Sequence, residues 1–501
     1  MAFSGHLNPV MCLAEGLLKP SCDGDNDNNS NKNENDVCII TIDYGVKKIQ
    51  SKCEALGIQL VGLDIRLGED YGLDSEKAIH VAAKSNVPFP FLADQSQALM
   101  DEALAKFQPD VIVSDFVCLA SQEYARTHNI PLVINWPGPL EGVKTFLQPV
   151  INIDNNRYIA VGGLFVSYVK CTIVKCAVFG NLENLGTLAD RIRNNVMNNG
   201  NSLVLLNSFW GLETPSLLPP NIVPVGPIMK PLSKEQPDIF SQLHPELHDF
   251  ITKARGKGKK ILLVTTGSMV QLDQWLVELL FRAFSQLQDC CSIVWSLKEP
   301  QQEFVPDIEN QNFYFSSWLP QPMLLAGDDL VDGVLTHCGW GGTMECIAGG
   351  KPVVVLPFAA DQMANAKLLL NAGCATTIGP IPPFNMDSRS SYKSNSLNAN
   401  TITEGCRRLL TDPQYLEAAK RLQALSTAPG LGCTAACDRI EHAGRHGIRH
   451  LSENNNDTAP THANRLTGHR PFLLTLVFCA MTAAAAKAVV VLALRPKTSS
   501  R

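Results

Sequence analysis

Several features that define other classes of protein are scarce or absent in this 501-residue chain. Only 18% of the residues are charged, the formal net charge is −6, and basic residues are not interleaved with aromatic ones. A nucleic-acid-binding surface is therefore not expected. The 16 cysteines form no C-x-x-C pair and stand at no zinc-ligand spacing from histidine. We expect reduced, buried cysteines in a reducing compartment, no metal site and no cofactor.

Apolar sequence is abundant, and its distribution predicts the fold class. The chain is 45% hydrophobic, and its length predicts two or three domains. In residues 1–150, short apolar runs such as "VCIITIDY", "VIVSDF" and "PLVINWPG" alternate with helical stretches. After a proline-rich crossing at 202–228, a second series runs from "KKILLVTTGSMV" to "KPVVVLPF". Such alternation is typical of an α/β fold with parallel sheets, here in two doubly wound halves.

The most distinctive stretch is "HCGWGGTMECIAGGKPVVVLPFAADQ", residues 337–362. An apolar strand leads through a glycine-rich turn into a helix, where unpaired N–H groups and the helix dipole favour an anion such as phosphate. His337 can add a donor there, and Glu345 lies about two turns further on, where it could accept hydrogen bonds from a ribose. Asp361 and Gln362 end the next strand and suit sugar hydroxyls. The set indicates a nucleotide diphosphate carrying a sugar.

From "WLPQ" to "ADQMANAKLL", residues 318–369, the chain resembles the donor signature of the UDP-dependent family 1 glycosyltransferases. The resemblance implies a GT-B fold, in which two Rossmann-like domains face a cleft, and an enzyme that uses a UDP-sugar. It also implies that Trp318 stacks on uracil, Gln321 holds the base or ribose, His337 meets the diphosphate and Glu345 the ribose. Trp340, Asp361 and Gln362 would face the sugar. The complete predicted donor site is Gly267, Ser268, Trp318, Leu319, Gln321, His337, Gly339, Trp340, Gly341, Gly342, Thr343, Glu345, Asp361 and Gln362.

One pair in this signature departs from the plant pattern. Gly341 and Gly342 stand where plant members have Asn-Ser, which removes two side-chain donors to phosphate. The backbone amides and Thr343 would then have to supply the missing contacts.

A catalytic pair is expected in the first half of the chain. "FSGHLNP" places His6 in a turn of small residues before the helix "VMCLAEGLL", and it resembles the catalytic histidine of the family. An ordinary pKa of about 6.5 suits a general base. Asp115, at the end of "VIVSD", occupies the position of its partner carboxylate. Asp115 could instead cap a helix, and the competing Asp110 precedes the strand, so it should lie at the opposite edge.

These residues predict a metal-independent, inverting transfer of a hexose to a hydroxyl of a small lipophilic acceptor. UDP-glucose is the expected donor because Asp361 and Gln362 offer no cation for a uronic acid, although UDP-glucuronic acid remains open. A nucleotide-sugar-binding relative without catalytic activity and a GT-B nucleotide-sugar epimerase are the alternatives. The sequence does not identify the acceptor.

The expected organisation is an acceptor-binding domain at 1–228, a linker at 229–255, a UDP-sugar-binding domain at 256–451 and a second linker at 452–470. Residues 19–36, rich in Asn and Asp, are expected to form a disordered insert. Residues 471–494 are mostly apolar, with Lys487 toward one end, and long enough to cross a bilayer of about 30 Å. We therefore expect a transmembrane helix and attachment to the endoplasmic reticulum, with a cytoplasmic protein as the alternative.

The first domain is expected to lack its first strand. A doubly wound sheet has that strand in its middle, with the catalytic histidine directly after it, but only five residues precede His6. The sequence thus predicts an unfilled slot in the sheet between the strands near 37–44 and 111–115, and we expect the true N-terminus to lie upstream.

Overall fold

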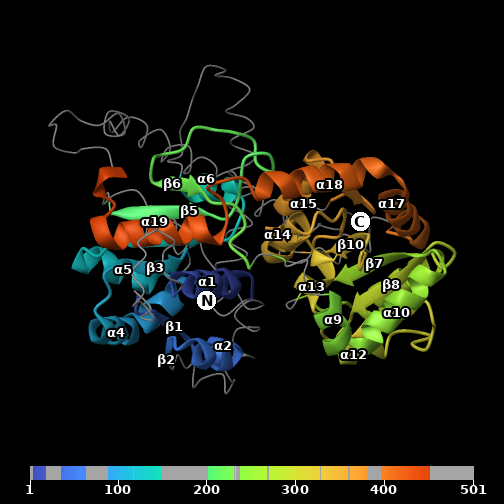
Figure 1. Ribbon diagram of the computed structural model, residues 1–501, viewed down its shortest axis with the longest axis horizontal. Helices are drawn as coiled ribbons and strands as arrows, with labels where there is room; N and C mark the ends of the chain where they lie inside the picture. The colour runs from blue at the N-terminus through green and yellow to red at the C-terminus, as the bar shows by residue number, and fades with distance from the viewer. Residues whose placement is uncertain are drawn as a thin grey trace, which may run out of the picture. The chain divides into compact units, whose positions relative to one another are not determined.

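The computed structural model of the chain describes residues 4–18, 35–63, 89–116, 118–147, 201–230, 232, 237–267, 270–327, 329–358, 361–381, 392 and 397–451. The part of the chain up to Leu451 forms one compact unit, in which helices cover parallel sheets (Figure 1). The α/β class and the two series of strands predicted from the sequence are present.

The second half of the chain contains a six-stranded sheet in which every pairing is parallel. Its order is β12-β11-β10-β7-β8-β9, so the direction of winding reverses between β7 and β10. In open sheets of this kind, ligands bind at the carboxyl ends of the strands at that reversal. The strands are β7 (Lys260–Thr265), β8 (Cys291–Ser296), β9 (Phe313–Ser316), β10 (Gly333–Thr336), β11 (Val353–Val355) and β12 (Ala375–Thr377).

Both faces of this sheet are covered because its strands are nearly continuous apolar runs. One face packs in a core that includes Trp295, which meets Phe284 edge-on at 5.3 Å. The other core includes Trp340 and Met344. The helices of this half are α9 (Pro237–Leu243), α10 (Pro245–Gly256), α11 (Gln274–Ser285), α12 (Glu299–Gln302), α13 (Gln321–Ala326), α14 (Trp340–Ala348), α15 (Gln362–Asn371), α17 (Ala399–Thr411) and α18 (Pro413–Ser426).

The first half has its described strands in two separate parallel sheets. One pairs β1 (Cys38–Ile42) with β2 (Gln59–Leu63). The other has the order β3-β4-β5-β6, formed by β3 (Ile112–Asp115), β4 (Leu132–Trp136), β5 (Ser202–Leu206) and β6 (Ile222–Pro224). The helices are α1 (Ser4–Leu17), α2 (Asp43–Leu56), α4 (Phe89–Phe107), α5 (Leu119–His128) and α6 (Leu140–Leu147).

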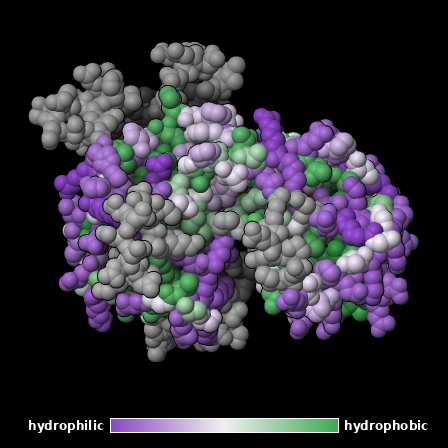
Figure 2. Space-filling model, in the orientation of Figure 1, coloured by the Kyte–Doolittle hydropathy of each residue, from purple (hydrophilic) through white to green (hydrophobic). Residues whose placement is uncertain are grey.

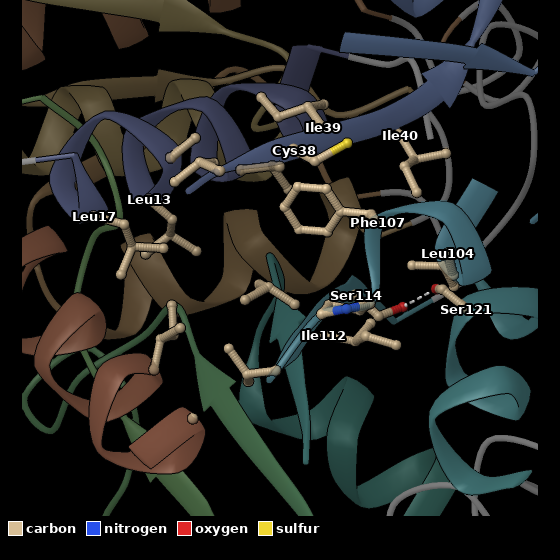
Figure 3. Close-up of a pocket in the computed structure, with 18 of the residues that line it drawn as sticks. Leu13, Leu17, Cys38, Ile39, Ile40, Leu104, Phe107, Ile112, Ser114 and Ser121 are labelled. Atoms are coloured by element: carbon tan, nitrogen blue, oxygen red, sulfur yellow. Dashed lines mark hydrogen bonds between the residues drawn. The ribbon is translucent and has the colours of Figure 1, made fainter. Parts of the chain in front are cut away.

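A cavity lies between the two sheets of the first half. Its volume is about 710 Å³, and β1 and β3 form two of its walls. Figure 3 shows Leu13 and Leu17 of α1 and Leu104 and Phe107 of α4 pointing into it. Residues of β1 and β3 thus face a common cavity.

The beginning of α1 differs from the expectation. His6 lies in the first turn of the helix, which begins at Ser4 instead of after the Asn-Pro pair. The helix includes Pro9, and a proline so close to the amino end removes only one of the helical hydrogen bonds.

The predicted second domain, 256–451, includes a helix that packs on the first half. This helix, α19 (Cys433–His446), contacts α1, and its Ile440 shares a core with Val133 of β4 and Leu205 of β5. A short 3-10 turn, Arg449–Leu451, follows it. The chain thus returns to the first sheet after completing the second.

Other predictions fall largely or wholly outside the described residues. These are most of the insert at 19–36, the linker at 452–470 and the transmembrane helix at 471–494. Within the part of the chain that the structure describes, no helix is long and apolar enough to span a bilayer. On the face drawn in Figure 2, hydrophilic residues cover most of the described surface, with hydrophobic ones visible between them. None of the described cysteines takes part in a disulfide.

Candidate functional site

The predicted catalytic pair is assembled at the carboxyl end of β3. Nδ1 of His6 lies 2.8 Å from Oδ2 of Asp115, although 109 positions separate the two residues. Asp115 is the last residue of β3 and is buried, whereas His6 remains partly accessible from the first turn of α1. Asp110 is exposed and precedes the strand. The alternative that Asp115 caps a helix does not account for this contact, because the carboxylate faces His6 and the residue at the start of α5 is Cys118.

Two neighbours that sequence reasoning missed hold this pair in place. The ring of Phe116 stacks on that of His6, with centroids 5.8 Å apart. Nε2 of the fully buried Gln122 donates to the carbonyl of Asp115 at 3.0 Å and to that of Phe116 at 3.1 Å. These bonds fix the backbone after β3. Gln122 lies seven positions after Asp115, on the next helix. No local motif indicates that its side chain points back to the end of β3.

The second cluster lies where the winding of the six-stranded sheet reverses. His337 follows β10, and Gly267 follows the adjacent β7. A Cβ at Gly267 would lie 2.5 Å from the His337 ring, and one at Gly339 would lie 2.4 Å from Nε2 of the same ring. A side chain at either position would therefore have to displace the His337 ring. Burial lowers the pKa of His337 to about 4, so the imidazole is neutral at neutral pH and can donate one N–H hydrogen bond.

The turn after His337 carries backbone strain that the sequence did not reveal. Cys338 has a φ of 62°, in the left-handed region that disfavours a residue with a side chain. Its carbonyl accepts a hydrogen bond of 2.9 Å from Nδ2 of Asn365, which is fully buried and also contacts Oδ2 of Asp361 at 2.7 Å. Asn365 thus joins the glycine-rich turn to the predicted sugar-facing residue. Its position one helical turn after Asp361 is the only sequence signal for this role.

Glu345 and Gln321, both predicted to hold the nucleoside, contact one another. Nε2 of Gln321 donates to Oε2 of Glu345 at 2.6 Å, which joins the start of α13 to α14. Burial raises the pKa of Glu345 to about 7, and the bond from Gln321 partly opposes that shift. When this carboxyl is deprotonated, both of its oxygens can accept hydrogen bonds from a diol; when it is protonated, one of them becomes a donor.

The two tryptophans of the signature have different environments. The side chain of Trp318 is 67% exposed, beside the ring of His244 at 6.1 Å, so a flat face is accessible for stacking. Trp340 is only 6% exposed, and its Nε1 donates to the carbonyl of Asn207 at 3.1 Å. The structure thus places Trp340 in the core, where it connects α14 to the end of β5, and not on an open surface facing a sugar.

Several other predicted donor residues can be placed. Thr343 is fully buried, so the structure does not present its hydroxyl as a substitute phosphate contact. Leu319 is also buried. A Cβ at Gly342 would meet nothing closer than 3.6 Å, so this position has room for a side chain. Gly341 lies in the first turn of α14, and Ser268 lies outside the described residues.

Asp361 and Gln362 begin α15 after the strand β11. Oε1 of Gln362 accepts a hydrogen bond of 2.8 Å from the backbone N–H of Phe358, which fixes the orientation of the amide. Burial raises the pKa of Asp361, while Asn365 and the charge of a protonated His6 lower it. The electrostatic influence of His6 links the catalytic pair to the donor cluster. Among the residues that the structure describes, no group of three or more His, Cys, Asp or Glu side chains could hold a metal.

Comparison with known sequences places the chain among its relatives. The profile described as "UDP-glucoronosyl and UDP-glucosyl transferase" (UDPGT) matches residues 187–453, just over half of the chain. The protein belongs to the UDPGT family. This match covers all of the predicted donor residues, whereas the His6–Asp115 pair lies outside it.

Individual relatives agree with this assignment. A UDP-glycosyltransferase from Talaromyces amestolkiae is 32% identical over 48% of this chain and 45% of its own length. The UDP-glycosyltransferase stmC from Aspergillus ustus is 30% identical over 48% of this chain and 45% of its own length. The chain spans about half the length of these curated relatives. The crystal structure of Os79 from O. sativa in complex with U2F and trichothecene shares the fold, with a TM-score of 0.61 at 16% identity, covering 88% of this chain and 97% of Os79.

The two shifted pKa values predict opposing effects of pH on this UDPGT-family protein. Folding raises the pKa of Glu345 from 4.5 to about 7, so its contribution to stability falls as the pH rises through that window. Folding lowers the pKa of His337 from 6.5 to about 4, so its contribution rises as the pH increases from about 4 to 6.5. We expect Glu345→Gln to remove the first effect. The stability of the variant, relative to wild type, should then increase by up to about 3 kcal/mol between pH 4.5 and 7.

Urea unfolding of both proteins at a series of pH values measures this difference. Glu278→Gln, on the surface helix α11, serves as a matched control and should follow the wild-type curve. Parallel curves for wild type and Glu345→Gln would show that the Glu345 carboxyl is not shifted by folding.

Proposed function

We propose that this protein transfers a hexose from a UDP-sugar to a hydroxyl of a small lipophilic acceptor. The observation that carries the proposal is the contact of 2.8 Å between His6 and the buried Asp115. A protein that only binds a nucleotide sugar has no use for such a base. Membership of the UDPGT family supports a UDP-sugar as the donor.

The arrangement of the pair suits general-base catalysis. With Nδ1 directed at Asp115, the other ring nitrogen of His6 is positioned to take the proton of an acceptor hydroxyl. Asp115 orients the ring and stabilises the imidazolium that forms, as the carboxylate does in catalytic triads. The acceptor oxygen bonds to the anomeric carbon as the bond from that carbon to UDP breaks, and the configuration inverts. No covalent intermediate with the protein is required.

The donor cluster supplies the electrostatic part of the mechanism. Negative charge develops on the leaving UDP, and the backbone N–H groups that begin α14, together with the N–H of His337, suit that charge. Trp318 would stack on the uracil and Glu345 would accept the ribose hydroxyls. This chemistry needs no metal ion.

We propose glucose as the sugar. Asp361 and Gln362 provide a carboxylate and an amide oriented by Asn365 and by the N–H of Phe358. A partner for the carboxylate of glucuronic acid would be cationic, and neither Asp361 nor Gln362 is. The trichothecene in the Os79 complex is consistent with a small organic acceptor.

The test is a transfer assay on the full chain with UDP-glucose, UDP-galactose or UDP-glucuronic acid. Each donor is incubated with a mixture of phenolic, sterol and lipid alcohols, with and without EDTA, and the products are identified by mass spectrometry. We expect a hexosylated acceptor and free UDP, with UDP-glucose the best donor and EDTA without effect. NMR of the product should show that the configuration of the anomeric carbon is inverted.

The same assay separates the alternatives. An epimerase would convert the UDP-sugar into an isomer without any acceptor, and a binding protein would yield neither product while still binding UDP in calorimetry. Retention of configuration would contradict the direct displacement. Transfer of glucuronic acid in preference to glucose would contradict the choice of donor only.

A further inference from the structure

The helices α1 and α19 pack against one another (Figure 1), and three cysteines lie in their interface. Cys12 belongs to α1, whereas Cys433 and Cys437 belong to α19 and are one helical turn apart. Cys12 and Cys437 are buried, and Cys433 is only partly buried. The mechanism of sugar transfer proposed above uses none of these side chains.

A glycine on α1 allows the two helices to approach closely at this point. A Cβ at Gly16 would lie 2.5 Å from Sγ of Cys437 and 3.5 Å from Sγ of Cys433. The thiol of Cys437 donates to the carbonyl of Leu13 at 3.6 Å. The thiol of Cys433 donates to the carbonyl of Cys12 at 3.1 Å. The packing of the helices therefore holds Cys433 against Cys12, although 421 positions separate the two residues.

The thiols of Cys12 and Cys433 also contact one another directly. A hydrogen bond with the Cys433 thiol, together with burial, raises the pKa of the Cys12 thiol well above its usual range. A shift with this cause means that Cys12 stays protonated and donates its S–H to the sulfur of Cys433. Two sulfur atoms in such contact can reach the disulfide bond length of about 2.05 Å after a small rotation of their side chains.

The two thiols have different environments, which assigns a different part of an oxidation to each. Cys433 is the first residue of the 14-residue helix α19, where the helix dipole favours a negative charge. It is also the more accessible of the two residues, whereas Cys12 is only 6% exposed. A thiolate is the form that attacks an oxidant, so Cys433 is the residue that reacts first. The adjacent Cys12 is placed to attack the product.

We propose that Cys433 and Cys12 form a redox site, which a hydroperoxide oxidises to a disulfide between α19 and α1. The thiolate of Cys433 attacks one oxygen of the peroxide, the O–O bond breaks, and hydroxide or alkoxide leaves. Cys433 is then a sulfenic acid. The sulfur of Cys12 attacks that of Cys433, the S–S bond forms as the S–O bond breaks, and the hydroxyl leaves as water with the proton of Cys12. The peroxide gains the two electrons that the thiols lose.

The disulfide would connect the helix that carries His6 to the helix that returns to the first sheet from the second half of the chain. Thiol–disulfide exchange with a reductant such as glutathione restores both thiols, so the bond is reversible. Disulfides of this kind in a reducing compartment are transient and report the presence of an oxidant. The site is separate from the His6–Asp115 pair and from the donor cluster.

The experiment treats the reduced, folded full chain with hydrogen peroxide. The remaining thiols are blocked, and the peptides are mapped by mass spectrometry without reduction. We expect the peptide containing Cys12 to be joined to the peptide containing Cys433, with the loss of two hydrogen atoms, and dithiothreitol to separate them. Cys290→Ser removes a partly buried thiol in the other half of the chain. This matched control should form the same cross-link as the wild type.

Two variants separate the roles of the thiols. In Cys12→Ser the sulfenic acid has no partner to attack it, so dimedone should label Cys433 at least about tenfold more than in the wild type. In Cys433→Ser, Cys12 should stay reduced. In the wild type, oxidation of Cys433 to sulfinic or sulfonic acid alone, or its pairing with another cysteine such as Cys437, would overturn the proposal. Dimedone labelling of Cys12 in Cys433→Ser would overturn the order of the steps. None of these readouts requires transfer activity, so they remain separate from the test of the proposed function.

Discussion

Replacing His6 with alanine is expected to reduce the turnover of sugar transfer about a thousandfold. The variant loses the base that the contact with Asp115 orients, and general-base catalysis contributes a factor of about 10² to 10⁴. UDP affinity should be unchanged, because the donor cluster is built from the second half of the chain. Steady-state kinetics and calorimetric titration with UDP measure the two quantities on the same preparation.

His442→Ala provides a matched control for this experiment. His442 is exposed on α19, where its ring lies near those of His446 and His450, and it contacts neither the catalytic pair nor the donor cluster. Its replacement should leave turnover near the wild-type value. Wild-type turnover in His6→Ala would show that another group removes the proton, whereas a parallel loss of UDP binding would indicate a structural role for His6.

Replacing Gly339 with alanine is expected to weaken UDP binding by about ten- to a hundredfold. The backbone at Gly339 has a φ of −61°, which any residue adopts, so conformational strain does not contribute. The added Cβ would lie 2.4 Å from Nε2 of His337 and must displace the ring from the glycine-rich turn. The displaced ring can then no longer donate to the diphosphate, and a hydrogen bond to a charged group contributes about 1.5–3 kcal/mol, which corresponds to the expected loss of affinity.

Two further variants test the steric cause. Gly256→Ala, at the end of α10, places a Cβ where nothing lies within 4 Å, and it should bind UDP like the wild type. In the double variant Gly339→Ala/His337→Ala, the clash is absent, so its Tm should exceed that of Gly339→Ala alone. Wild-type UDP affinity in Gly339→Ala would show that His337 can leave this position without affecting the donor site.

The donor cluster could be predicted from sequence because its residues are close together along the chain. Gln321, His337 and Glu345 lie within 25 positions, on two consecutive units of strand and helix whose apolar runs are unambiguous. Parallel strands place their carboxyl ends at one edge, so the order of the motif nearly determines its geometry.

The burial of individual side chains could not be predicted in this way. Trp318 and Trp340 both belong to the donor signature, yet one is exposed and the other donates a hydrogen bond to Asn207, 133 positions away. Thr343 belongs to the same motif, but its place on the inner face of α14 buries it. Which face of a short helix meets the core depends on the elements packed against it, and these come from distant parts of the chain.

The sequence by itself determined the α/β class, the two series of strands and the order of the donor motif, since each depends on local apolar patterning and spacing. Only the tertiary structure decided the contacts between distant residues. It brought His6 to Asp115 and placed α19 beside α1. It also shifted the pKa values of His337 and Glu345 through burial. These properties depend on how far each group is removed from water and on what packs beside it, and neither quantity is encoded within a short stretch of sequence.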